Sequence, residues 1–205
     1  MKKAIILILV VCALSNVPVN AQEATTFGVF FGGNYSALTG VSKFEPKALP
    51  GLDLGMVFSG RGKVIGWDLD FYYSWRQSNF KDFYALYSFH FLGMEAMFKV
   101  YPFKKLGLNV QLGYQLNFDL GNYSSVEQLF VRGFVIGLAY DIGKRWTVDF
   151  NTWLSARPII TQSIKEWEYP PDGGLPQEVY NTYEFYLSTL SLSVTYKLWE
   201  LKSDH

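Results

Sequence analysis

After residue 21 the chain has no cysteine, because Cys12 is the only one among its 205 residues. Disulfides, thiolate catalysis and cysteine metal sites are therefore excluded from this part. It also lacks an apolar run of the roughly 20 residues that a membrane helix needs. Neither sign of charge is in large excess, since residues 22–205 carry 16 basic and 18 acidic side chains, a formal charge of −2. This weak balance indicates no nucleic-acid partner.

The N-terminus has the features of a secretory signal peptide. Lys2 and Lys3 precede an apolar run at residues 4–14, and a small-residue cleavage site ends at Ala21. The apolar run is too short to span a membrane as a helix. We therefore expect residues 1–21 to be removed and residues 22–205 to form a single domain.

Residues 65–76 alternate between two kinds of side chain, which is the period of a β-strand. One face takes Ile65, Trp67, Leu69, Phe71, Tyr73 and Trp75, and the other takes Gly66, Asp68, Asp70, Tyr72, Ser74 and Arg76. The core of a soluble protein could not easily accept the charged face. Lipid outside and a polar lumen inside would accept both faces, so the pattern is typical of a transmembrane β-barrel strand.

The same alternation recurs along the chain and predicts eight strands, most clearly at residues 108–120. Three short connections, GRGK, PFKK and DIGK, alternate with longer ones. Outer-membrane barrels have this asymmetry, with short periplasmic turns, long external loops and both termini in the periplasm. We predict an all-β, eight-stranded antiparallel transmembrane barrel in the outer membrane, with a long extracellular loop at about residues 157–184. We expect aromatic girdles, formed near the short turns by Trp67, Tyr101, Tyr140, Trp146, Tyr196 and Trp199, and near the loops by Tyr35, Tyr73 and Trp75.

Four segments resemble the PorT-like "porin family" of outer-membrane barrels of Bacteroidetes. They read GVFFGGNYSALTG, MEAMFKVYPF, LGLNVQLGYQL and GFVIGLAYDIG. The resemblance covers essentially the whole chain after the signal peptide. It implies an outer-membrane location and, in a few members, association with secretion machinery. One departure is that such barrels usually finish on an aromatic residue, whereas Trp199 is followed here by residues 200–205.

Charged residues on the inward-facing parity, meaning the alternate strand positions that point into the barrel, are the first candidates for a site. An eight-stranded barrel has an interior only wide enough for side chains. We therefore expect these residues to bond to one another and fill the lumen, so that the barrel is not an open pore. A polar permeation path is the functional alternative. The predicted lumen network consists of Asp68, Asp70, Glu95, Lys99, Asp149 and Lys197.

Catalysis would require a different set of residues, and Ser88 and His90 are the only pair that suggests it. Their spacing of two places both on one strand face, but that face continues into Leu92 and is the one predicted to meet lipid. A Ser–His pair also needs an orienting acid, and that face supplies none. We predict no catalytic residue, no cofactor and no metal site. A lipid-A-modifying barrel enzyme remains the enzymatic alternative.

The predicted long loop is the best candidate for recognition. Trp167 and Tyr169, with prolines around them, could present a rigid aromatic surface. The expected partners are outer-membrane lipid and lipopolysaccharide, together with a protein partner at the external loops. The leading hypothesis is a non-enzymatic structural or interaction barrel. A soluble, lipocalin-like ligand carrier is the competitor, and it would hide its apolar faces inside.

Overall fold

The computed structural model describes residues 22–40, 45–80, 83–103, 106–121, 130–168 and 177–201. Residues 1–21, the predicted signal peptide, lie outside this part. No helix among the described residues is long and apolar enough to cross a membrane. The described residues form the strands β1 (Gln22–Thr39), β2 (Pro46–Gly62), β3 (Ile65–Phe80), β4 (Phe83–Val100), β5 (Leu108–Asp119), β6 (Phe130–Ile142), β7 (Trp146–Ser155), β8 (Ile160–Glu168) and β9 (Gln177–Leu201).

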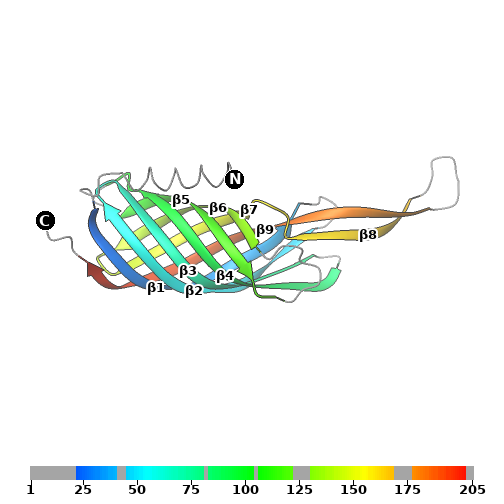
Figure 1. Cartoon of the computed structure of the whole chain (residues 1–205), viewed down its shortest axis with the longest axis horizontal. Helices are drawn as coiled ribbons and strands as arrows, with labels where there is room; N and C mark the ends of the chain where they lie inside the picture. The colour runs from blue at the N-terminus through cyan, green and yellow to red at the C-terminus, as the bar shows by residue number, and fades with distance from the viewer. Residues whose placement is uncertain are drawn as a thin grey trace, which may run out of the picture.

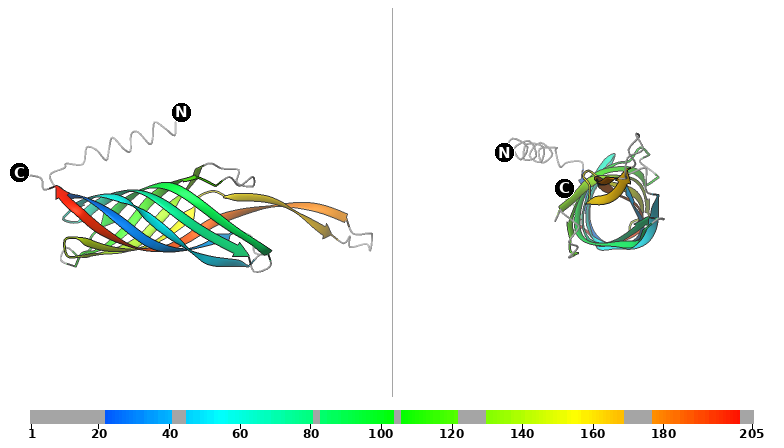
Figure 2. Two further views of the ribbon diagram at one scale, coloured as in Figure 1. Left: turned by 90° about the horizontal axis from the view of Figure 1, so that it is seen from below. Right: turned by 90° about the vertical axis from the view of Figure 1, so that its right-hand side faces the viewer.

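Eight of these strands close into a ring. Each strand from β1 to β6 pairs antiparallel with the next, and β9 pairs with both β7 and β1. Figure 2 shows the ring end-on, and Figure 1 shows its tilted strands from the side. Closure removes the free edges that would otherwise expose unpaired backbone groups. The predicted eight-stranded antiparallel barrel is confirmed.

The predicted loop at residues 157–184 is wrong over most of its length. β8 pairs with the first part of β9, from Ile160 opposite Phe185 to Glu168 opposite Gln177. The resulting hairpin projects well beyond the ring (Figure 1). Its strands are rich in β-branched and aromatic residues, which favour a β-ladder, while the prolines that suggested a loop stand at positions 170, 171 and 176, outside the described residues.

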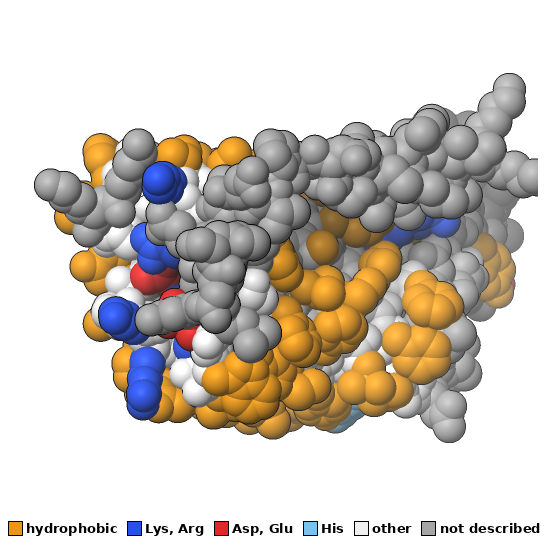
Figure 3. All heavy atoms as spheres, turned by 60° about the vertical axis from the view of Figure 1, so that its left-hand side comes forward, with side chains coloured by type: hydrophobic (Ala, Val, Ile, Leu, Met, Phe, Trp, Pro, Cys, Tyr) orange, Lys and Arg blue, Asp and Glu red, His pale blue; other side chains and the backbone are white. Residues whose placement is uncertain are grey.

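The two strand faces point as the alternation predicts. In β5, the Leu112 side chain is 60% exposed on the outer wall, whereas Gln111 is fully buried inside. The other strands of the ring repeat this arrangement, and Figure 3 shows hydrophobic side chains over much of the outer wall. A lipocalin-like carrier would require the opposite arrangement, with apolar side chains lining the cup.

Most of the aromatic residues predicted for the turn-end girdle are exposed on the outer wall, with one correction; their position at a membrane surface stays a prediction. Trp67, Tyr140, Trp146 and Trp199 are exposed near the short turns. Tyr101 is instead buried at the mouth of the ring, with the Arg61 guanidinium 4.4 Å from its ring centroid. It continues the inward parity of Met97 and Lys99, which should have excluded it from the girdle. Burial raises the pKa of the Tyr101 phenol to about 12.

Inward-facing glycines make room for large side chains from the neighbouring strand. A Cβ added to Gly93 would overlap the Tyr72 ring, and one added to Gly133 would overlap Trp153. The Tyr72 hydroxyl reaches across β4 and donates a hydrogen bond to Asn117 Oδ1 at 2.7 Å. Because an eight-stranded interior is narrow, large residues fit only where an adjacent strand has no side chain.

Candidate functional site

The interior of the ring is apolar toward the end from which the hairpin projects. We call this group of buried side chains the apolar plug. Phe89 and Phe91 are both fully buried at its centre, with ring planes 2° apart and centroids 6.0 Å apart. The apolar plug consists of Leu38, Phe80, Phe89, Phe91, Met97, Val131, Val135, Trp153, Ile159, Ile160, Phe185 and Leu187.

Sequence reasoning missed the apolar plug because it looked for charges on the inward parity. The available signal was that this parity changes from polar to apolar near the loop end of several strands, as at Phe89 and Phe91 in β4 and at Trp153 in β7. The run FHFL has phenylalanine at both inward positions, which favours a strand whose inner face is packed in an apolar interior.

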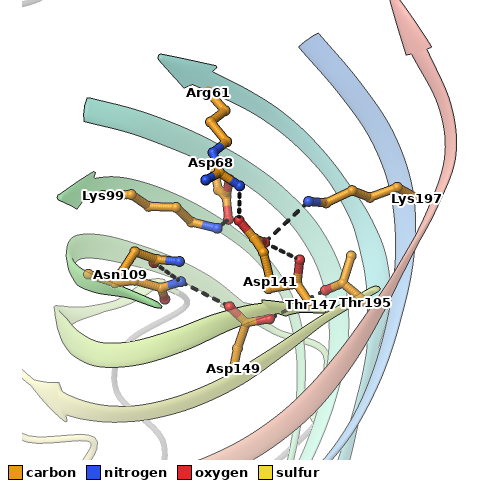
Figure 4. Close-up of polar contacts among 10 residues, drawn as sticks. Arg61, Asp68, Lys99, Asn109, Asp141, Thr147, Asp149, Thr195 and Lys197 are labelled. Atoms are coloured by element: carbon orange, nitrogen blue, oxygen red, sulfur yellow. Dashed lines mark hydrogen bonds and ion pairs between the residues drawn. The ribbon is translucent and has the colours of Figure 1, made fainter. Parts of the chain in front are cut away.

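The interior toward the short turns is polar, and Asp141 is the centre of its first cluster (Figure 4). Arg61 Nη1 donates to Asp141 Oδ2 at 2.7 Å, and Lys197 Nζ donates to Oδ1 at 3.2 Å. Thr147 Oγ1 adds a bond to Oδ1 at 2.7 Å. One buried carboxylate thus joins β2, β6, β7 and β9 across the mouth of the ring.

A second cluster lies deeper in the polar part. Lys99 and Asp68, both buried, form an ion pair between β4 and β3. Asp149 accepts a hydrogen bond from Gln111 Nε2 at 2.9 Å and a longer one from Thr195 Oγ1 at 3.5 Å. Each strand contributes from its inward face, so the cluster ties neighbouring parts of the wall together.

Between the polar part and the apolar plug lies a cavity of about 50 Å³. Asp70 and Glu95, which are opposite one another in the β3–β4 register, both line it. Arg76 lines the cavity next to the plug, with Nε donating to Ser74 Oγ at 2.9 Å and the guanidinium carbon 4.5 Å from the Trp153 ring centroid. The five carboxylates that line the cavity belong to Asp53, Asp68, Asp70, Glu95 and Asp149.

The structure places all six residues of the predicted lumen network inside the ring. It does not join them into one network. Lys99 pairs with Asp68, whereas Lys197 pairs with Asp141, which sequence reasoning had placed in a turn and left out. Their role in filling the lumen stays a prediction.

Ser88 and His90 lie on the outward face, as their parity predicts. Trp75 Nε1 donates a hydrogen bond to Ser88 Oγ at 2.9 Å, while His90 Nδ1 lies 2.6 Å from the Tyr73 hydroxyl. The described contacts therefore hold each residue against an aromatic partner and do not join Ser88 to His90. Among the residues placed by the structure, no group of three His, Cys, Asp or Glu side chains is arranged to hold a metal ion.

The far part of the hairpin contains one of the two candidate recognition residues. The backbone of Trp167 belongs to β8 and is opposite Glu178. Tyr169 lies outside the described residues. Tyr180, on the facing strand, is 66% exposed and was missed, because that stretch of β9 was interpreted as part of a loop.

No protein-family model and no curated protein matches the sequence. Among solved structures, the chain is similar to Neisserial surface protein A, with 14% identity and a TM-score of 0.51 over 86% of this chain and 100% of that one. Ail of Yersinia pestis, solved with the heparin analogue sucrose octasulfate, has 12% identity and a TM-score of 0.44 over 86% and 99% of the two chains. OprG of Pseudomonas aeruginosa has 13% identity and a TM-score of 0.44 over 87% and 98%. At these identities, the first similarity shows the small outer-membrane barrel fold alone, and the PorT-like assignment stays a prediction.

Proposed function

We propose that this protein is a non-enzymatic outer-membrane barrel with a closed lumen, which presents the β8–β9 hairpin outside the cell. The exposed apolar wall and the aromatic residues near its ends support the membrane location. The first and last described residues lie at the same end of the ring as the short turns. In outer-membrane barrels that end faces the periplasm, so the hairpin would face outward.

The apolar plug is the observation that carries the proposal of a closed lumen. Ions lose hydration when they enter an apolar passage, and the cost is high unless polar groups replace the water. Phe89, Phe91 and Leu187 fill the interior with apolar side chains and offer no such replacement. A permeation path through the polar part would therefore end at the apolar plug.

We expect the refolded protein to show no steady conductance in a planar bilayer. Large porins of 16 to 18 strands leave an aqueous channel, whereas eight strands leave only room for side chains. A porin of that larger class, reconstituted in the same lipid, is the control for the recording. Steady nanosiemens-scale openings from the monomer would refute the closed lumen.

The hairpin supports a recognition role because the barrel does not need it. β7 and β9 are neighbours in the ring, and a few residues suffice to connect adjacent antiparallel strands. Among the described strands, β8 pairs with β9 alone. Segments held out by a rigid scaffold commonly carry binding functions. We propose that Trp167 and Tyr169, together with Tyr180, form the contact surface for an extracellular partner.

Shortening the hairpin should remove partner binding and leave the barrel intact. Since Lys165 is opposite Tyr180, residues 165–180 can be replaced by an Asn-Gly turn without changing the register of the remaining pairs. We expect heat-modifiable migration in gels to persist, and specific partners captured from outer-membrane extracts by the full-length protein to be lost. Tyr180→Ser tests the contribution of one exposed ring within an unshortened hairpin. Identical capture by the full-length and shortened proteins, or none by either, would remove the recognition role.

A further inference from the structure

The two ends of the barrel differ in charge. In the sequence, the three short turns at residues 60–63, 102–105 and 141–145 carry six basic residues and one acidic residue. The longer connections, at residues 40–49, 77–84, 120–129 and 156–184, carry five basic and eight acidic residues. Lys and Arg side chains stand around the turn end in Figure 3. The barrel therefore has a basic turn end and an acidic loop end.

The basic turn between β6 and β7 is built against aromatic residues on the outer wall. We call Lys144, Arg145, Trp146 and Tyr196 the β6–β7 patch. Arg145 Nη1 donates a hydrogen bond to the Tyr196 hydroxyl at 3.0 Å, and the Trp146 and Tyr196 ring centroids are 4.6 Å apart. The backbone N–H of Lys197 donates to the Arg145 carbonyl at 2.8 Å, which fixes the turn to β9.

The two cations of the β6–β7 patch keep most of their donors available. A guanidinium has five N–H donors, and the described contacts use one of those of Arg145. Asp141, the acid in the turn, is occupied by Arg61, Lys197 and Thr147. Within the described ranges, neither Lys144 nor Arg145 forms an ion pair with a carboxylate. Both side chains are exposed.

We propose that the β6–β7 patch binds the phosphate of an anionic glycerophospholipid in the periplasmic leaflet. This inference rests on the proposed outer-membrane location. Trp and Tyr at a membrane surface mark the level of the headgroups, so Arg145 stands beside Trp146 at the depth of lipid phosphates. Arginine binds phosphate through two parallel hydrogen bonds. The adjacent Lys144 adds a second positive charge, which favours an anionic headgroup over a zwitterionic one.

The test compares lipid retention by the full-length protein in nanodiscs that contain equal amounts of phosphatidylglycerol and phosphatidylcholine. After transfer to mild detergent, native mass spectrometry counts the lipids that stay bound. We expect the wild type to retain phosphatidylglycerol preferentially. Arg145→Gln and Lys144→Gln should each lower that preference about fivefold, corresponding to about 1 kcal/mol per basic residue near a membrane surface. Lys47→Gln and Arg157→Gln, exposed positions toward the loop end, are the matched controls and should retain the wild-type preference.

Three results would overturn the inference. The first is equal retention of both lipids by the wild type, and the second is equal loss of preference in the patch variants and the loop-end controls. The third is displacement of the bound lipid by millimolar inorganic phosphate, which would make free phosphate the ligand. Heat-modifiable migration in pure phosphatidylcholine separates the two proposals, because an inserted barrel without lipid preference refutes the patch alone, whereas failure to insert into any bilayer refutes the membrane location.

Discussion

Replacing Lys99 with methionine should destabilise the barrel by about 3–5 kcal/mol, the usual cost of removing one partner from a buried ion pair. The ammonium group of Lys99 pairs with Asp68, and both side chains are buried. Without it, the Asp68 carboxylate would remain buried next to Asp70 and Glu95, which line the same cavity. A buried charge that loses its counterion keeps its desolvation cost and loses the attraction that offset it. Urea unfolding in lipid vesicles, followed by tryptophan fluorescence, measures the change.

The double variant Lys99→Met/Asp68→Asn separates the charge effect from a packing effect. It removes both charges, so we expect it to recover most of the lost stability. Lys63→Met removes a cation at an exposed position near the same end and should change stability by less than about 0.5 kcal/mol. If the double variant is less stable than Lys99→Met, the ion pair is not the reason for the loss.

Introducing arginine on the outer wall at Leu112 should cost about 2–4 kcal/mol, because the charge would face hydrocarbon near the middle of a bilayer. Arginine at the neighbouring position, Gln111, should cost less. The Gln111 amide already donates to Asp149 at 2.9 Å, and a guanidinium at this position could donate to the same carboxylate. Folding yield into liposomes and urea unfolding of the folded fraction give both effects.

The order of the two variants is the informative result. Leu112→Ala shortens the same outward side chain without adding a charge, and it controls for the loss of apolar surface. If Gln111→Arg impairs folding more than Leu112→Arg, overpacking inside the narrow lumen outweighs the cost of placing a charge in lipid. In that case an added arginine would be tolerated better on the outward face than on the inward face, contrary to the prediction.

The β8–β9 hairpin shows where reading the sequence alone reached its limit. The alternation within residues 160–168 and within 177–185 does not by itself show that the two segments pair across the eight residues between them. Prolines and glycines between them favour a loop when each residue is considered separately. Pairing depends on which segments meet at the end of the ring, and that is a tertiary property.

Asp141 illustrates the same limit for the candidate site. Its partners Arg61 and Lys197 are 80 and 56 residues away in the chain, so no motif of fixed spacing connects them. The tilt and register of β2, β6 and β9 bring them together at the mouth. The turn sequence DIGK begins with Asp141, which left this residue out of the predicted lumen network, although the inward-facing alternation that includes Ala139 continues into it.

The sequence by itself determined the eight-stranded antiparallel barrel and which face of each strand points outward. The reason is that successive side chains of a strand point to opposite faces, so the alternation of polar and apolar residues shows which side chains share a face. Only the tertiary structure decided which inward side chains bond, where the apolar plug begins, and that β8 extends the sheet beyond the ring. These features depend on register between strands distant in the chain and on the narrow space inside the ring, which allows Tyr72 to fit only against Gly93.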